Sequence, residues 1–269
     1  MTPICAFDID PSGRAVPVAS ASAEPPAQGY RWLHLDLTDP ATVKWIHAEL
    51  PERVAAALTQ AETRPRCDVV GDGMILNLRA INLNDGADVA DMISLRCWVS
   101  AGLVITARLR RVFAADDMRL QAEAGHAPAD AGVFVATLTD RLVDRIEGAS
   151  VALTDAMDAV DDRVLDADEG VHDELGPVRR RAIMLLRFAR PQRDAVAKMS
   201  TVNAVVDEHE RLRLAESALR LTRAVEEMEA VRDRGAAAAD HLDAIHAARH
   251  SRNSYALSVV RRCSCRWAF

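Results

Sequence analysis

Hydrophobic and polar residues alternate along several short segments in the first 110 or so residues, which is the pattern of half-buried β-strands. In segment 30–37, for example, Trp32, His34 and Asp36 alternate with leucines. The same kind of pattern predicts further strands over residues 4–9, 67–70, 74–83, 92–99 and 103–107.

Short helices and tight turns are predicted between these strands. Asp39 suits an N-cap and Pro40 the first helical position, so a helix is expected to begin there. Pro51 similarly begins a second helix, which is expected to run to about residue 61. Gly71-Asp72-Gly73 and Ser100-Ala101-Gly102 indicate turns between strands, the second of them a hairpin.

From residue 132 to residue 260 the apolar residues recur at helical spacing, and no further strand is predicted. Breaks are expected at Gly170, at Gly176-Pro177 and around Asp207, and Pro191 is expected to kink its helix. The last segment, 207–260, has no break and would form one helix about 80 Å long, the longest in the chain. Apolar and small residues recur along it about every 3.5 residues, a spacing that permits packing against other helices: Leu214, Ala218, Leu221, Val225, Met228, Gly235, Ala239, Leu242 and Ile245.

A helix of this length is typical of a stalk or of a seam between copies of a chain. The alternative is a helical hairpin that reverses near Gly235 and folds back on its neighbour. Taken together, the pattern predicts an α+β chain with a mixed sheet first and long helices after it.

Composition narrows the class of protein. The chain has 269 residues, about half of them apolar, so it can build a substantial core. Its 33 basic and 40 acidic residues give a net charge of −7, which disfavours a general nucleic-acid binder. No apolar stretch reaches the ~18 residues that a membrane helix needs. The N-terminus lacks a basic region followed by an apolar core, so no secretory signal is predicted.

The five cysteines and the short motifs give little sign of chemistry. The odd number of cysteines, and their scattered positions, predict reduced cytosolic thiols and no disulfide framework. The sequence contains no Gly-x-Ser-x-Gly, no glycine-rich phosphate loop and no His-Glu-x-x-His. We therefore expect neither enzymatic activity nor an organic cofactor.

Two groups of side chains have the spacing of metal ligands. The first is a row of carboxylates at three- and four-residue steps on one face of a predicted helix: Asp155, Asp158, Asp162, Asp166 and Glu169. The opposite face is an apolar stripe of Leu153, Met157, Val160 and Val164. Mg²⁺ or another hard cation would relieve the repulsion between neighbouring carboxylates. The alternative is an acidic face that is simply solvated.

The second group lies on the predicted long helix. His246 and His250 are four residues apart and project together, so they can chelate one Zn²⁺ ion, and Asp243 could add an oxygen ligand. In a symmetric oligomer these residues would repeat around an axis. The alternative is a polar helix flank that faces water or a neighbouring chain.

Several segments, in this order along the chain, resemble the soluble domain of the CorA family of metal-ion transporters, with a closer likeness to its zinc-transporting ZntB branch. The segments are Tyr30-Arg31-Trp32-Leu33-His34-Leu35-Asp36-Leu37, Glu62-Thr63-Arg64-Pro65-Arg66, Leu78-Arg79-Ala80-Ile81-Asn82-Leu83-Asn84, Asp91-Met92-Ile93-Ser94-Leu95-Arg96-Cys97-Trp98, Ile105-Thr106-Ala107-Arg108, Arg190-Pro191-Gln192-Arg193 and 211–234.

This resemblance implies a mixed-sheet αβα sandwich followed by long helices, assembled as a homopentameric funnel whose stalks surround an ion path. It implies a divalent cation, Zn or Mg, as the transported ion, and a place at the cytoplasmic face of the inner membrane. The expected division is a mixed αβ funnel domain over 1–130, a helical hairpin region with the acidic helix over 131–206, and a stalk helix over 207–260.

Residues 261–269 depart from the family's pattern. Arg252 and Tyr255 resemble the family's entry into its first membrane helix, but Arg-Arg-Cys-Ser-Cys-Arg-Trp-Ala-Phe follows in place of an apolar helix. Codon arithmetic permits an apolar sequence in a shifted frame, so we interpret this tail as a one-base frameshift that truncates the transporter before its membrane helices. The rival interpretation makes Cys263 and Cys265 a metal or redox pair.

The function expected is therefore the cytoplasmic domain of a divalent-cation transporter, truncated and unable to transport alone. It would associate weakly, in an equilibrium that shifts with divalent cation. The alternative is a soluble metal-responsive oligomeric interaction module with no membrane part.

Overall fold

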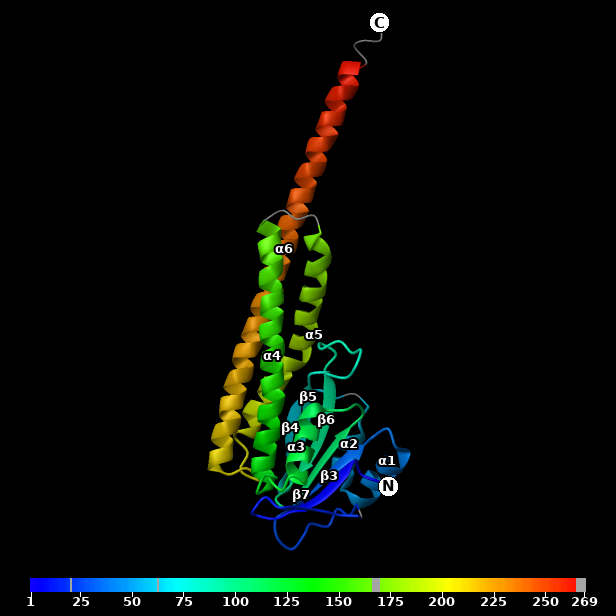
Figure 1. The fold of residues 1–269 in the computed structure, drawn as a ribbon, viewed down its shortest axis with the longest axis vertical. Coiled ribbons are helices and arrows are strands. Elements are labelled where there is room, and N and C mark those ends of the chain that lie inside the picture. Colours follow the sequence, from blue (N-terminus) through cyan, green and yellow to red (C-terminus); the bar gives the residue numbers. More distant parts are fainter. Residues whose placement is uncertain (20, 62, 166–169, 265–269) are drawn as a thin grey trace.

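The computed structural model describes residues 1–19, 21–61, 63–165 and 170–264. Figure 1 shows a unit containing the β-sheet, beside which three long helices run together. The last of them continues alone, away from the sheet, toward the C-terminus. The predicted order, with the sheet first and the long helices after it, is confirmed.

One mixed sheet forms the N-terminal unit. Its seven strands lie in the order β2-β1-β3-β7-β6-β5-β4, and only the central β3–β7 pair is parallel. The strands are β1 (Cys5–Ile9), β2 (Ala15–Pro17), β3 (Tyr30–Asp36), β4 (Arg66–Val70), β5 (Gly73–Ala80), β6 (Ile93–Val99) and β7 (Leu103–Arg108).

Helices cover both faces of the sheet, which confirms the αβα sandwich. Helices α1 (Pro40–Glu49) and α2 (Glu52–Thr59) pack on one face, in a core that includes Leu33. The other face is covered by α3 (Phe113–Glu123) and the first part of α4 (Ala131–Leu165), in a core that includes Trp32. Consecutive strand residues thus point into different cores, and both are apolar because neither face meets water.

Local signals behave as the sequence predicts at the first helix. The Asp39 side chain accepts a hydrogen bond from the backbone N–H of Ala41 at 2.9 Å, and Pro40 occupies the first helical position.

In the sheet, Trp32 donates its indole N–H to the Thr106 hydroxyl at 2.9 Å, and His34 Nδ1 lies 2.7 Å from the same oxygen. His34 is fully buried, and this burial lowers its pKa to about 4.

The long helices are α4, α5 (Val171–Met199) and α6 (Glu208–Ser264). The single long helix predicted over 207–260 is confirmed by α6, which has no reversal near Gly235. The break predicted at Gly176-Pro177 is wrong, because α5 passes through it. Pro177 lies only two turns into the helix, and its missing N–H removes a single interior bond, so the packing of α5 outweighs that loss.

Apolar residues of the helices pack together along the unit. The stripe predicted on α4 is buried, as is the α6 stripe from Leu214 to Leu242. Among residues 243–252, 254 and 255, whose burial is described, only Ile245 is half-buried and the rest are exposed. Because the stripe is already covered by the other helices of the same chain, it can form a seam between copies only at the C-terminal end of α6. No helix in the described ranges is both long enough and apolar enough to cross a bilayer.

Candidate functional site

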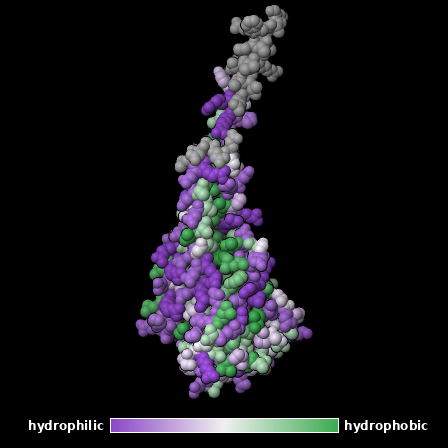
Figure 2. Space-filling model, viewed as in Figure 1, coloured by the Kyte–Doolittle hydropathy of each residue, from purple (hydrophilic) through white to green (hydrophobic). Residues whose placement is uncertain are grey.

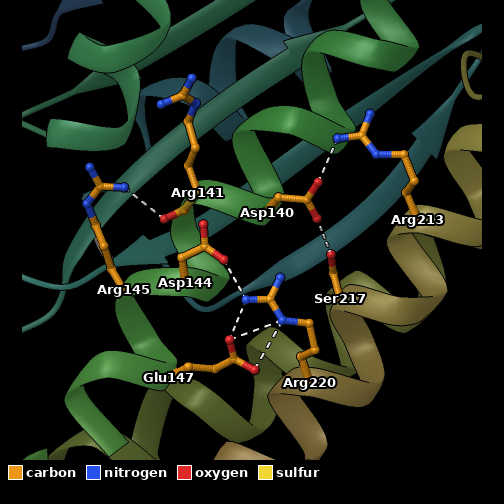
Figure 3. A network of polar contacts seen from close by, with 8 residues as sticks. All are labelled: Asp140, Arg141, Asp144, Arg145, Glu147, Arg213, Ser217 and Arg220. Atoms are coloured by element: carbon orange, nitrogen blue, oxygen red, sulfur yellow. Dashed lines mark hydrogen bonds and ion pairs between the residues drawn. The ribbon is translucent and has the colours of Figure 1, made fainter.

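A repeated set of ion pairs joins α4 to α6 over most of the length of α4, and Figure 3 shows the two pairs nearest the start of α4. The pairs are Asp140–Arg213, Glu147–Arg220 and Asp161–Arg234, which we call the charge ladder. The two members of every pair are 73 residues apart in sequence. A constant separation means that the two helices run parallel. The pairs follow one another at steps of seven and then fourteen residues, multiples of the heptad repeat of helices that pack along a seam.

The part of the ladder nearest the start of α4 consists of two groups of polar contacts. Arg213 Nη2 donates to Asp140 Oδ2 at 2.6 Å, and Ser217 donates its hydroxyl proton to the other oxygen of the same carboxylate. Arg220 reaches both Asp144 and Glu147, with Nε 3.0 Å from Glu147 Oε2. Hydrogen bonds from its guanidinium to these carboxylates raise the pKa of Arg220. Figure 3 shows Arg213 and Arg220 extending from α6 across to α4.

Figure 2 shows that hydrophilic residues dominate the visible face of the long helices. The charged side chains of the ladder are only partly buried, such as Arg220 and Asp144 with 23% and 60% of their side chains exposed. Exposed ion pairs contribute ~1 kcal/mol or less each. The ladder therefore determines the register of the helices more than it determines their stability.

The acidic face predicted on α4 lies where the ladder ends. Asp155, Asp158 and Asp162 are exposed, as that hypothesis requires, whereas Asp166 and Glu169 lie outside the described residues. Arg234 of α6 binds Asp158 at 2.6 Å and also pairs with Asp161. The protein thus supplies, from α6, a positive charge of the kind that the hypothesis assigned to a hydrated cation.

The stalk candidates lie on the part of α6 that has left the other two helices. Asp243, His246 and His250 are all exposed, and their spacing places them on one side of the helix. Across the described residues, no three His, Cys, Asp or Glu side chains come together as a metal-binding group. A stalk site would therefore take its remaining ligands from water or from a second copy.

Three of the described cysteines, Cys5, Cys67 and Cys97, are free, as the prediction of reduced thiols requires. Cys67 and Cys97 are buried and free, and burial raises their pKa values to about 11 and about 12. Low-pKa thiolates are the reactive form, so these two sulfurs are poor nucleophiles and poor metal ligands. Of the rival Cys263–Cys265 pair, Cys265 lies outside the described residues.

Sequence patterning did not identify the ladder. Its signal was present, because Arg213 and Arg220 are one heptad apart and so are Asp140 and Glu147. Assigning which arginine pairs with which carboxylate, however, requires knowing how the two helices align, because the paired residues are 73 positions apart in the sequence.

Comparisons with known proteins agree on one family. The family model described as "CorA-like Mg2+ transporter protein" matches residues 27–263. The "Zinc transport protein ZntB" of Pectobacterium atrosepticum is 28% identical over 261 residues, covering 95% of this chain and 79% of that protein.

Two solved structures superpose closely. The full-length CmaX protein is 30% identical with a TM-score of 0.88, covering 96% of this chain and 82% of that one. The ZntB cytoplasmic domain from Vibrio parahaemolyticus is 21% identical with a TM-score of 0.79, covering 94% of this chain and 100% of that one. The second likeness shows a shared fold.

Proposed function

Because the chain belongs to the CorA-like Mg2+ transporter protein family, we propose that it forms the cytoplasmic part of a divalent-cation transporter of the inner membrane, with zinc as the transported ion. The name of its ZntB relatives supports the choice of zinc. The family relationship does not favour the alternative of a soluble interaction module that never had a membrane part.

The observation that carries the proposal is the course of α6. This helix starts beside α4, is held in register with it by the ladder, and then extends alone past Leu242 (Figure 1). The family match extends to residue 263, so it includes this lone part. We propose that five copies assemble with these lone segments around the ion path, as a homopentamer.

The cation would meet the protein first at the stalk. His246 and His250, with Asp243 one turn earlier, offer imidazole and carboxylate ligands suited to Zn²⁺. In a pentamer each set is repeated around the axis, which supplies the ligands that a single chain lacks. The α4 face with Asp155, Asp158 and Asp162 is proposed for a harder cation such as Mg²⁺, in competition with Arg234.

Calorimetry with Zn²⁺ at pH 7.5 and pH 5.5 tests the stalk site. We expect modest affinity at pH 7.5, lost in His246→Ala/His250→Ala, and weaker binding at pH 5.5, because imidazole must be neutral to coordinate. His241→Ala is the matched control, since His241 is an exposed histidine on the same helix but off the proposed face. Unchanged Zn²⁺ binding in the double variant would rule out this site.

Sedimentation of the same chain tests the assembly. We expect its mass to increase when EDTA is replaced by millimolar Zn²⁺, and the increase to be absent in the double histidine variant. An identical mass under both conditions would contradict cation-linked assembly.

A further inference from the structure

A cleft of about 640 Å³ opens beside the sheet, far from the stalk in sequence. It lies where the segment after α2, the ends of β5 and β6, the segment after β7 and the middle of α5 meet. Its described lining includes one carboxylate, Asp91, and six arginines: Arg64, Arg66, Arg79, Arg96, Arg110 and Arg187.

Among the described residues, two acidic side chains pair with arginines of the cleft other than Arg79. Asp91 pairs with Arg110 at 3.4 Å, and Asp68 pairs with Arg66 at 3.2 Å, and both pairs are exposed. Such pairs are weak because water screens them. The cleft therefore keeps a net positive charge among the described residues.

Arg96 is the most unusual member of the group. It lies on β6 and is 1% exposed, and Nη2 donates to the backbone oxygen of Gln60 at 3.0 Å. Its Nε and Nη1 atoms are buried and have no hydrogen-bond partner. Burying an ionised guanidinium without an anion is costly, because arginine stays charged in proteins. Its burial lowers the pKa of Arg96.

The strand beside Arg96 extends this unsatisfied polar region. Asn77 of β5 is the cross-strand partner of Arg96, so both side chains project from the same face of the sheet. The Asn77 amide is also buried, and both its polar atoms lack partners. Buried polar groups normally have partners, so the unpaired atoms of Arg96, which lines the cleft, indicate a ligand there.

The opposite wall would suit the organic part of such a ligand. Phe188 of α5 lies in the cleft, with the Arg79 guanidinium stacked over its ring at 4.1 Å. Met92, Ile93 and Leu109 add apolar surface. A pocket of this size, mainly polar with an apolar wall, is in the range used for small organic ligands.

From this combination we propose that the cleft binds a small organic phosphate, with its phosphate group above Arg96 and its organic part against Phe188. Guanidinium groups bind phosphate oxygens through paired, charge-assisted hydrogen bonds. A phosphate group therefore accounts for several arginines around one cleft better than a halide ion does. The site joins residues of the sheet to residues of α5, so the ligand would strengthen the attachment of the helical unit to the sheet.

The experiment measures binding of pyrophosphate and of ADP to the whole chain by calorimetry, with sodium chloride at matched ionic strength as reference. We expect ADP to bind at least five-fold more tightly than pyrophosphate, and chloride to give no saturable heat. Arg96→Met should weaken the binding of ADP at least ten-fold. Arg180→Gln is the matched control, because Arg180 is exposed on α5 one heptad before Arg187 and outside the cleft, and it should leave binding unchanged.

Should Arg96→Met fail to fold, Arg64→Gln/Arg187→Gln removes two exposed charges from the rim and should weaken ADP at least five-fold. Equal ADP affinity in these variants and the unsubstituted chain would overturn the site. Equal affinity for ADP and pyrophosphate would overturn the proposal that the organic part of the ligand binds against Phe188. If neither binds, and sedimentation shows self-association that the rim variant abolishes, the cleft instead receives an acidic segment of a second copy. None of these measurements involves a metal ion, so their failure is distinct from failure of the transport proposal.

Discussion

Gln192 attaches α5 to the sheet through two hydrogen bonds to a single residue. Its Oε1 accepts from the backbone N–H of Arg79 at 2.5 Å, and its Nε2 donates to the Arg79 carbonyl at 2.9 Å. The last partner pair between β4 and β5 is Arg66–Asn77, so β4 offers no backbone to Arg79. The glutamine side chain, 1% exposed, thus takes the place of a missing strand.

Gln192→Ala would leave a donor and an acceptor of Arg79 without partners. Each unsatisfied buried group costs about 1–3 kcal/mol, and this site is partly buried, so we expect a loss of about 3 kcal/mol in the free energy of unfolding. For a chain of this size, 1 kcal/mol corresponds to about 2–4 °C. The midpoint of thermal unfolding should therefore fall by about 6–12 °C.

Circular dichroism and calorimetry of the same variants would measure this shift. Gln192→Glu keeps an acceptor for the Arg79 N–H but loses the donor and buries a charge, so it should be at least as destabilising. Gln121→Ala is the control, because the half-buried Gln121 accepts a single hydrogen bond, from Arg141, and should lower the midpoint by less than about 3 °C. A shift below about 2 °C in Gln192→Ala, or a Gln192→Glu variant as stable as the unsubstituted chain, would refute the reasoning.

Three further outcomes follow from single contacts. A Cβ at Gly235 would lie 2.5 Å from Arg179 Cγ, so Gly235→Ala should destabilise the chain. In an Arg179→Ala variant the same substitution should instead stabilise the chain, by up to about 1 kcal/mol. A change of the same sign in both backgrounds, measured by urea unfolding, would contradict this. Arg234→Gln should raise the affinity of the α4 face for Mg²⁺ several-fold in calorimetry, because it releases Asp158; unchanged affinity would show that Arg234 does not compete. Because the pKa of His34 is lowered to about 4, its contribution to stability is complete above about pH 6.5 and is lost as the pH falls toward 4. The free energy of unfolding, measured with urea, should fall less steeply between pH 6.5 and pH 5 in His34→Gln than in the unsubstituted chain. Equal slopes of this free energy against pH would refute the assignment.

The parts of the fold that were predicted from sequence are those fixed by local signals. The cap at Asp39, the strand around Trp32 and the unbroken α6 all depend on residues within a few positions of each other. The two missed elements lack such signals. Strand β2 has three residues and little burial, and α3 begins at Phe113 after an N-cap residue, Val112, whose side chain makes no capping hydrogen bond.

The candidate sites show the same division. The sequence correctly placed Asp155, Asp158 and Asp162 on one exposed face, because helical spacing is local. It gave no indication that Arg234 lies against that face, since this contact depends on how α4 and α6 align. The arginine cleft is assembled from five separate segments of the chain, so no short motif reveals it.

The charge ladder also limits how α6 can move. A slide of one heptad, about 10 Å, toward the C-terminal end of α4 would keep one pair, Arg213 against Glu147, but would set Arg220 against Thr154, which carries no charge. A slide of one heptad the other way would set Arg220 against Asp140 but would bring Glu227 against Glu147, two like charges. Shorter slides break all three pairs at once. A piston stroke of α6 along α4 therefore loses ion pairs in both directions, whereas a tilt or rotation of the two helices together keeps all of them.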